Sequence, residues 1–232
     1  MSLNERPLCD AHIHPKAAQM CGHPEFLLFV NSIDESDFSK FPSFSASRYY
    51  FAGIHPWNLR KPKYKNTGYY FDLLERAVRR GFFLGETGID RLHPNIEIQI
   101  DYFRHHYNLA QTYERPLTFH SVHADDTILS VIKSPYPKMI YHSFVGSLRN
   151  AEPFLKKNVF LSFSRRSLYS SATAETIREC PSDRLLIESD STDEEPSSIL
   201  TEVLEKTASI RKITVDNLLK QVLDNMNLII RK

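Results

Sequence analysis

Cysteine is scarce in this 232-residue sequence, and the few cysteines present form no motif. Cys9, Cys21 and Cys180 are odd in number, widely separated and never arranged as CxxC. A disulfide framework and a zinc site built from thiolates are therefore both disfavoured, and a reducing cytosol is the expected compartment.

Long apolar runs are also missing. No uninterrupted hydrophobic stretch approaches the ~18 residues that a membrane-spanning helix requires. The opening segment MSLNERPLCD carries charges where a signal peptide needs an apolar core. We therefore expect a soluble, cytoplasmic protein without a membrane association, and no obligate protein partner is evident.

Strong charge bias and phosphate-binding loops are absent as well. The formal net charge is +1, so any attraction for nucleic acid must come from a local patch. Neither GxGxxG nor GxxxxGKS/T occurs, which disfavours an open nucleotide-binding sheet. Hydrophobic residues at 41% and charged residues at 25% are typical of a globular chain, and we expect one domain over 1–232.

Short apolar runs recur along the chain, and eight of them read as buried strands. They cover residues 8–14, 26–32, 49–55, 82–88, 116–121, 138–144, 159–163 and 184–190. Helical periodicity marks 71–80, 96–113, 125–133, 148–156, 172–180, 197–209 and 215–230. This alternation predicts a parallel sheet closed into a single (β/α)8 TIM-type barrel. The short, proline-containing segment 34–48 predicts a degenerate second unit.

Potential metal ligands stand where these apolar runs end, which is where an α/β barrel keeps its chemistry. They are His12, His14, Glu86, His120, His142 and Asp190. Residues two apart on a strand project to one face, so the HxH pair can bind a single ion. Taken singly, each histidine also fits a turn or a satisfied core position, and Glu86 also fits a buried partner of an arginine. Recurrence at equivalent strand ends favours a metal centre.

Four imidazoles and two carboxylates suffice for two divalent cations that share Glu86. The first two histidines and Asp190 would hold one ion, and the other two histidines would hold the second. Mixed donors suit zinc, manganese or iron, and magnesium less. An adjacent ion pair serves phosphoryl chemistry, with Glu86 and Asp190 as the expected catalytic residues and Asp190 as proton acceptor. Glu188 would support Asp190 or a ligand.

Six ordered motifs, DAHIHP, GIHP, GETGID, PxxxH, HSFxG and LxESD, resemble those of the TatD family of metal-dependent deoxyribonucleases, within the amidohydrolase-like barrels. The resemblance extends from Asp10 to about Asn225. It implies a TIM-type barrel, hydrolysis of DNA phosphodiester bonds with a divalent metal, and metal ligation by the six residues named above.

Three positions depart from the pattern of that family. Arg91 follows Asp90 where a tyrosine is usual, Val122 stands where an arginine usually follows the strand-end histidine, and Thr192 replaces a proline. None of these changes removes a ligand. We therefore expect them to alter how a phosphate or leaving group is held.

Cations and aromatic residues follow several strand ends and predict contacts with nucleic acid on the rim that carries the metals. The residues expected to contact substrate are His55, Arg60, Lys61, Arg91, His123 and Arg165. Solvated loop side chains are the alternative interpretation for each of them.

The sequence therefore predicts a metal-dependent deoxyribonuclease. A barrel mouth admits a strand end more readily than an intact duplex, which favours an exonuclease on single-stranded or frayed ends. A hydrolase of a small phosphoester, an amide or a lactone is the alternative, because one barrel hosts many chemistries. A binding protein with a vestigial site is disfavoured, since buried unpaired imidazoles and carboxylates are costly without a metal.

Overall fold

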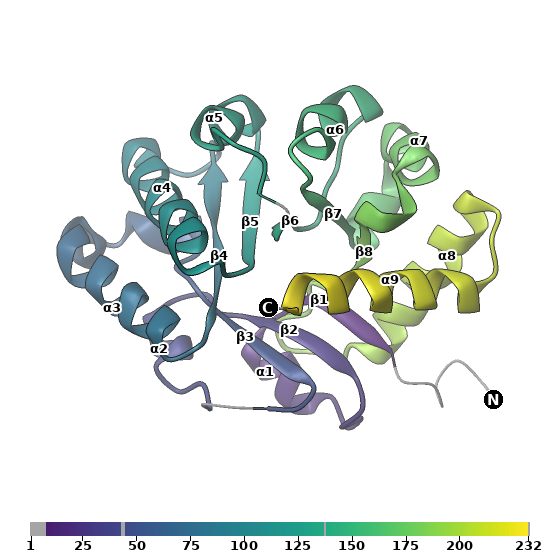
Figure 1. Cartoon of the computed structure of the whole chain (residues 1–232), viewed down its shortest axis with the longest axis horizontal. Helices are drawn as coiled ribbons and strands as arrows, with labels where there is room; N and C mark the ends of the chain where they lie inside the picture. Colours follow the sequence, from purple (N-terminus) through teal and green to yellow (C-terminus); the bar gives the residue numbers. More distant parts are fainter. Residues whose placement is uncertain (1–7, 43–44, 137, 232) are drawn as a thin grey trace.

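The computed structural model describes residues 8–42, 45–136 and 138–231. Eight parallel strands form one sheet in chain order from β1 to β8. They are β1 (Cys9–Ile13), β2 (Leu27–Asn31), β3 (Arg48–Ala52), β4 (Phe83–Asp90), β5 (Leu117–Val122), β6 (Met139–Tyr141), β7 (Phe160–Phe163) and β8 (Leu185–Ile187). The predicted (β/α)8 TIM-type barrel is confirmed, because helices lie between the strands around a nearly closed sheet (Figure 1).

The helices form the outer layer of the barrel. They are α1 (Pro15–Met20), α2 (Glu35–Phe38), α3 (Thr67–Arg79), α4 (Ile96–Tyr113), α5 (Asp125–Val131), α6 (Leu148–Leu155), α7 (Ser171–Glu179), α8 (Ser197–Arg211) and α9 (Val215–Ile230). Short 3-10 helices of the described residues join them, η2 (Pro56–Arg60), η3 (Pro62–Lys65), η4 (Arg165–Tyr169) and η5 (Ser182–Arg184). The second unit is short, as its sequence predicts, since α2 has only four residues. Residues 43–44 of that predicted unit lie outside the described residues.

Two short elements differ from the sequence prediction. Helix α1 was not predicted, because six residues are too few to show helical periodicity. The segment after β3, predicted as a loop, folds into η2 and η3, each with a proline in its first turn. Proline sets φ near its helical value and loses no needed hydrogen bond there, which suits a 3-10 turn.

The seam between β8 and β1 closes through backbone hydrogen bonds beyond the regular strands. Asp190 N donates to His12 O at 3.0 Å, and His14 N donates to Ser191 O at 2.9 Å. Helix α9 packs against β8 and β1 on the outside of this seam (Figure 1). The first and last units of the barrel are thereby joined at the end that carries His12, His14 and Asp190.

Asp10 is the side chain that reinforces this seam. It is fully buried, and its Oδ1 accepts hydrogen bonds from Ser189 N at 3.0 Å and His12 N at 3.1 Å. Its Oδ2 accepts from Ser189 Oγ at 2.5 Å. One carboxylate therefore binds the end of β8 to β1.

Replacing Asp10 by alanine should lower the free energy of unfolding by about 3 kcal/mol, because three buried donors lose their acceptor. Asp10→Asn should cost less, since an amide oxygen can still accept from the two backbone N–H groups. Urea unfolding measures both. Asp193→Ala, an exposed carboxylate beyond β8, is the control, and equal stability of Asp10→Ala and this control would contradict the role.

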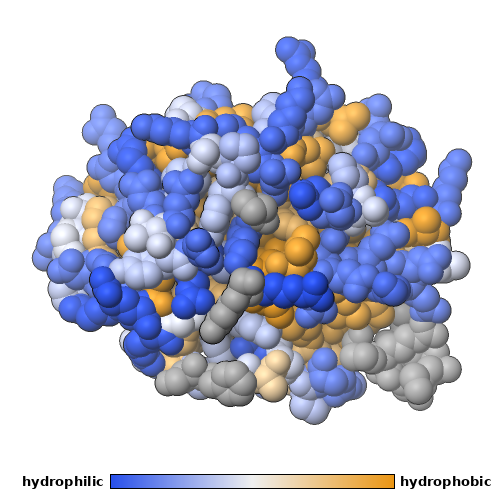
Figure 2. Space-filling view, viewed as in Figure 1, coloured by the Kyte–Doolittle hydropathy of each residue, from blue (hydrophilic) through white to orange (hydrophobic). Residues whose placement is uncertain are grey.

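Apolar side chains fill the space inside the strands and between strands and helices. Figure 2 shows a largely hydrophilic face, with hydrophobic residues visible mainly toward the middle of the view. No helix in the described part of the chain is long and apolar enough to cross a bilayer. Several polar side chains are nevertheless buried with this apolar core, among them His12, Glu86, His120 and His142.

Candidate metal centre

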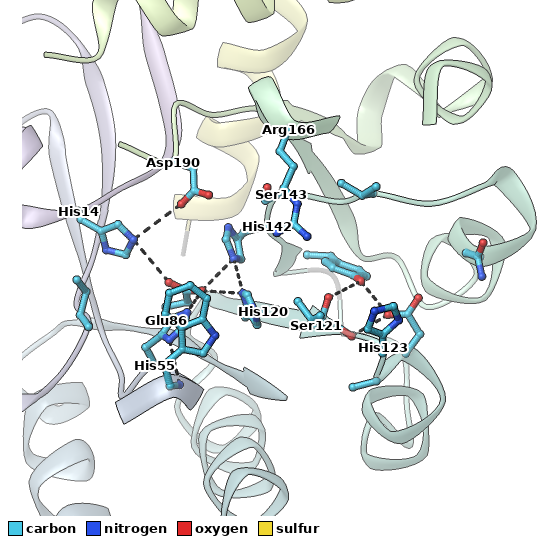
Figure 3. A pocket seen from close by; sticks show the side chains of 18 of the residues that line it. His14, His55, Glu86, His120, Ser121, His123, His142, Ser143, Arg166 and Asp190 are labelled. Atoms are coloured by element: carbon cyan, nitrogen blue, oxygen red, sulfur yellow. Dashed lines mark hydrogen bonds and ion pairs between the residues drawn. The ribbon is translucent and has the colours of Figure 1, made fainter. Parts of the chain in front are cut away.

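Polar side chains from five strands, β1, β4, β5, β6 and β8, or from the turns directly after them, converge at the carboxyl-terminal mouth of the barrel. They border a cavity of about 710 Å³ whose lining also includes residues from the loops after β5, β6 and β7. The structure brings all six sequence-predicted ligands together, with Glu86 at their centre. Figure 3 shows His14, Glu86, His120, His142 and Asp190 around this centre. Residues that are far apart in the chain thus form one group.

Glu86 lies at the centre of the group, only 1% exposed. Its Oε2 lies 3.3 Å from His12 Nε2 and 3.8 Å from His14 Nε2. Its Oε1 lies 2.9 Å from His142 Nε2 and 3.3 Å from His120 Nδ1. The two oxygens of Glu86 therefore face different histidines, His12 and His14 on one side and His120, His142 and also His55 on the other, which suits a carboxylate that bridges two ions.

The donor set fits a metal because its innermost atoms lack other partners. Neither Glu86 oxygen and neither ring nitrogen of His12 forms a hydrogen bond with any residue that the structure describes. Buried polar atoms without partners are costly and rare. His120 Nδ1 lies 3.1 Å from His142 Nε2, and two atoms bound about 2.1 Å from one ion lie roughly 3.0–3.4 Å apart.

A hydrogen bond at Nδ1 of His14 directs its other ring nitrogen, Nε2, toward the centre of the group. His14 Nδ1 lies 3.0 Å from the backbone oxygen of Asn31, which can only accept. Nδ1 therefore carries the proton, and the lone pair of Nε2 faces Glu86 and Asp190. A backbone carbonyl that orients a histidine in this way is common at metal sites.

Carboxylates orient the other two inward-facing histidines. His142 Nδ1 lies 3.3 Å from Glu188 Oε1, and His120 Nε2 lies 3.4 Å from Asp90 Oδ2. Burial alone would lower the pKa of His142, but Glu86 and Glu188 raise it well above its ordinary value. Glu188 is the supporting residue that the sequence suggested, whereas Asp90 was missed, although it ends β4 in the GETGID motif.

Asp190 lies on the open side of the group. Its Oδ1 lies 3.8 Å from His12 Nε2 and 3.9 Å from His14 Nε2, and its side chain is 35% exposed. Strand β8 ends at Ile187, so Asp190 follows the strand rather than ending it, in contrast to the prediction. Its φ of 54° lies in the left-handed region, which asparagine and aspartate tolerate better than most residues. The turn after β8, and not strand alternation, brings this carboxylate to the group.

His55 lies nearer the centre than its predicted role of substrate contact requires. Its Nε2 is 3.2 Å from Glu86 Oε1, and its Nδ1 accepts a hydrogen bond from Trp57 N at 3.2 Å. Burial lowers the pKa of His55 more than Glu86 raises it, which favours the neutral ring. A neutral ring that accepts at Nδ1 carries its proton on Nε2, so His55 presents an N–H group to the cavity.

None of the four predicted substrate-contacting cations lines the cavity. Lys61 Nζ lies 3.8 Å from Asp34 Oδ2, and Arg165 Nε lies 2.7 Å from Glu202 Oε2. Arg60 is exposed on η2 and is not part of the lining. Acidic side chains on neighbouring helices and loops hold Lys61 and Arg165 away from the mouth, and the sequence alone does not reveal those partners.

Arg91 and His123 lie at the rim after β4 and β5. Arg91 Nη2 lies 3.1 Å from Asp126 Oδ2 and donates to Thr127 Oγ1 at 2.6 Å, so it does not line the cavity directly. His123 does line the cavity, with a φ of 52°. Arg166, which the sequence places beside Arg165 on the rim after β7, also lines it. The chain turns within η4, so adjacent arginines face different partners.

Glycine at two positions allows the strands to approach one another at the metal group. A Cβ atom on Gly53 would lie 2.4 Å from the backbone oxygen of Glu86, and one on Gly88 would lie 2.0 Å from that of His120. Gly88 also has a φ of 139°, which side-chain-bearing residues rarely adopt. These glycines set the spacing at which Glu86 and His120 meet.

Asp90→Asn should weaken metal binding roughly 10–100-fold, because His120 loses the carboxylate that orients it. Burial opposes the ionisation of Asp90, yet hydrogen bonds from His120 and Trp57 hold its pKa below the usual range. Metal titration by calorimetry measures the effect. Asp126→Asn is the matched control on the same rim, and equal metal affinity of the two variants would contradict the prediction.

Several known proteins resemble this chain. An uncharacterised metal-dependent hydrolase of Buchnera aphidicola is 29% identical over 62% of this chain, and the match spans 58% of that protein's length. A human protein named 3'-5' RNA nuclease TATDN2 is 31% identical over 60% of this chain and 19% of its own length. Deoxyribonuclease Tat-D of Schizosaccharomyces pombe is 26% identical over 46% of this chain and 36% of its own.

The fold and the family agree with these matches. The structure of YjjV, a TatD homologue from Escherichia coli, superposes with a TM-score of 0.80 at 21% identity, over 96% of this chain and 97% of its own. That likeness shows the fold. The family described as TatD related DNase matches residues 30–231. The chain therefore belongs to the TatD-related DNase family of metal-dependent hydrolases.

Proposed function

We propose that this protein hydrolyses phosphodiester bonds of DNA with two divalent cations, acting on single-stranded or frayed ends. The main support for the proposal is that the two carboxylate oxygens of Glu86 face different histidines. Oε2 faces His12 and His14, and Oε1 faces His120 and His142. A shared carboxylate between two donor sets is typical of two-metal phosphoryl chemistry.

The names of two relatives support a nucleic-acid substrate. The Schizosaccharomyces pombe relative is named a deoxyribonuclease and the human relative an RNA nuclease. Both names concern those proteins. They agree with the family to which this chain belongs and favour a polynucleotide over an amide or a lactone.

Each cation would have its own donors. His12, His14 and Asp190 form one cluster of possible ligand atoms, and Glu86 and His120 belong to another together with His55. Glu86 also clusters with His12 and His142, between the two. We place one ion with His12, His14, Asp190 and Glu86 Oε2, and the other with His120, His142 and Glu86 Oε1. Imidazole and carboxylate donors together suit zinc or manganese better than magnesium. When bound, the cations would supply Lewis acidity for the attacking water and the leaving oxygen.

Asp190 and His55 would act beside these cations. Asp190 has the most exposed side chain of the six predicted ligands, so one of its oxygens is open to the cavity and can accept a proton from water. His55 Nε2–H lies 3.2 Å from Glu86 Oε1, beside the same space, and would be shared between that carboxylate and a phosphate oxygen. The cavity of about 710 Å³ has room for more than the reacting phosphodiester.

A metal-titrated nuclease assay tests the proposal. The wild-type protein should release nucleotides from single-stranded DNA faster than from a blunt duplex when zinc or manganese is present, and chelation should stop the release. Bis(p-nitrophenyl) phosphate and a lactone serve as small substrates. Hydrolysis of small substrates without any cleavage of DNA would overturn the proposal and favour the small-substrate alternative.

A further inference from the structure

The cavity extends beyond the metal group into a region that we name the β5–β7 arm. This arm is lined by Ser121, Val122, His123, Ser143, Val145, Asn150 and Arg166. In Figure 3, Ser121 and His123 lie on the opposite side of His142 from His14. The arm therefore offers space next to the reacting centre, on the side of the loops after β5, β6 and β7.

Arg166 is the one lysine or arginine that lines the cavity within the described part of the chain. Figure 3 shows its side chain reaching from the end of β7 into the space between His142 and the Ser121 side of the arm. It is exposed, and it forms no ion pair or hydrogen bond with any residue of 8–42, 45–136 and 138–231. Its charge is therefore available to a ligand.

Two other arginines near the rim have acidic partners. Arg165, the adjacent residue, binds Glu202 at 2.7 Å. Arg91 binds Asp126 at 3.1 Å, and this contact also neutralises an acidic residue of the lining. Among these rim arginines, Arg166 is thus distinguished by both its position and its lack of an acidic partner.

The acidic residue deepest in the arm is also occupied. Asp125 Oδ1 accepts hydrogen bonds from Ser121 Oγ at 2.7 Å and from Tyr141 Oη at 2.8 Å. Two hydroxyl groups hold this carboxylate in place, and it forms no ion pair with Arg166, so the guanidinium of Arg166 stays open to a ligand. A guanidinium in this setting matches the geometry of a phosphate group, to which it can donate two parallel hydrogen bonds.

We infer that Arg166 binds the phosphate that flanks the scissile one, so that the β5–β7 arm holds the neighbouring nucleotide of a single strand. The inference rests on the proposed nuclease function. The scissile phosphate would lie at the Glu86 group, and the next phosphate along the strand would lie in the arm beyond His142. Arg166 would then select polynucleotides over isolated phosphodiesters.

The contact is tested by a double-mutant cycle in which one change is made in the enzyme and the other in the substrate. The substrates are short single-stranded oligonucleotides that carry either a phosphate or an uncharged methylphosphonate at the linkage next to the cleaved one. Separate substrates place the methylphosphonate on the 5′ side and on the 3′ side of the cleaved linkage. Arg166→Gln should lower kcat/KM on the all-phosphate substrate roughly 10–100-fold, mainly through KM. On the methylphosphonate substrate, the same variant should lose less than about threefold, because the partner of the arginine is already gone.

Arg165→Gln is the matched control, since it removes the neighbouring charge that binds Glu202. It should leave both substrates unaffected. The kcat/KM of Arg166→Lys should fall between those of wild type and Arg166→Gln, because lysine keeps the charge but lacks the two parallel N–H donors of the guanidinium. The slope of log KM against log salt should become shallower by about 0.7 in Arg166→Gln, as expected for one lost phosphate contact on a single strand.

Equal losses on the two substrates, or no loss on either, would overturn the inference. Wild-type hydrolysis of bis(p-nitrophenyl) phosphate separates this failure from failure of the proposed function. If the metal-loaded wild type cleaves neither that compound nor DNA, the phosphodiesterase proposal fails. If it cleaves DNA and Arg166→Gln does not distinguish the two linkages, only the assignment of Arg166 fails.

Discussion

Glu86→Gln should abolish hydrolysis, with kcat/KM lowered by roughly 10³-fold or more, since even partners that only orient a ligand cost 10–100-fold. Glutamine has nearly the same shape, but it lacks the negative charge and offers only one good donor atom. Both proposed ions share this side chain, because its two oxygens face different histidine pairs. Assays at saturating zinc or manganese, with elemental analysis of the purified protein, measure the loss.

The surroundings of Glu86 favour its ionised form in the metal-free protein. Burial would raise its pKa, but His55, His142 and His12 hold the pKa well below the ordinary value. Glutamine at this position therefore removes a charge that the folded protein favours. Glu202→Gln, which changes a carboxylate outside the cavity, is the control. Retention of two bound ions in Glu86→Gln would contradict the bridging role.

Asp190→Asn should lower kcat about 10²–10⁴-fold while most of the metal is retained. An asparagine oxygen can still bind a cation, but the side chain cannot accept a proton from water. The φ of 54° at this position makes asparagine the appropriate substitution, because it tolerates the left-handed region, whereas alanine would add backbone strain. The loss of kcat can then be assigned to the carboxylate.

Steady-state kinetics at saturating metal, with metal content measured on the same samples, tests this prediction. The contrast with Glu86→Gln is informative, since one variant should lose metal and the other should lose rate. Loss of metal from Asp190→Asn to the same extent as from Glu86→Gln would show that Asp190 is only a ligand. A rate close to wild type would exclude it as the proton acceptor.

Local patterns predicted the barrel well. Helices α4 and α9 have the bounds that their periodicity predicted, Ile96–Tyr113 and Val215–Ile230. Each of these elements carries its own signal in consecutive residues, so no distant partner is needed to define it. Elements of a few residues, such as α1 and the 3-10 helices after β3, carry too little periodicity to be predicted in this way.

The convergence of five of the six donors also follows from local sequence. Parallel strands of a barrel end at the same face, so polar residues that close apolar runs meet there without further information. His12, Glu86 and His142 needed no knowledge of loop geometry to be placed together. Asp190 did, since it lies beyond β8 and reaches the group through a left-handed turn.

Partners that lie far apart in the chain were decided only by the tertiary structure. Nothing in consecutive residues shows that Arg165 binds Glu202, 37 positions away, while Arg166 faces the cavity. The same holds for Asp10, whose carboxylate meets Ser189 across 179 positions to close the barrel. The alternation of strands and helices and the donors at strand ends can be recognised in short segments of sequence. The direction of a loop side chain depends instead on which acidic or polar group the fold brings beside it. The meeting of the strand-end donors could thus be predicted from the sequence, whereas the partners of the loop arginines could not.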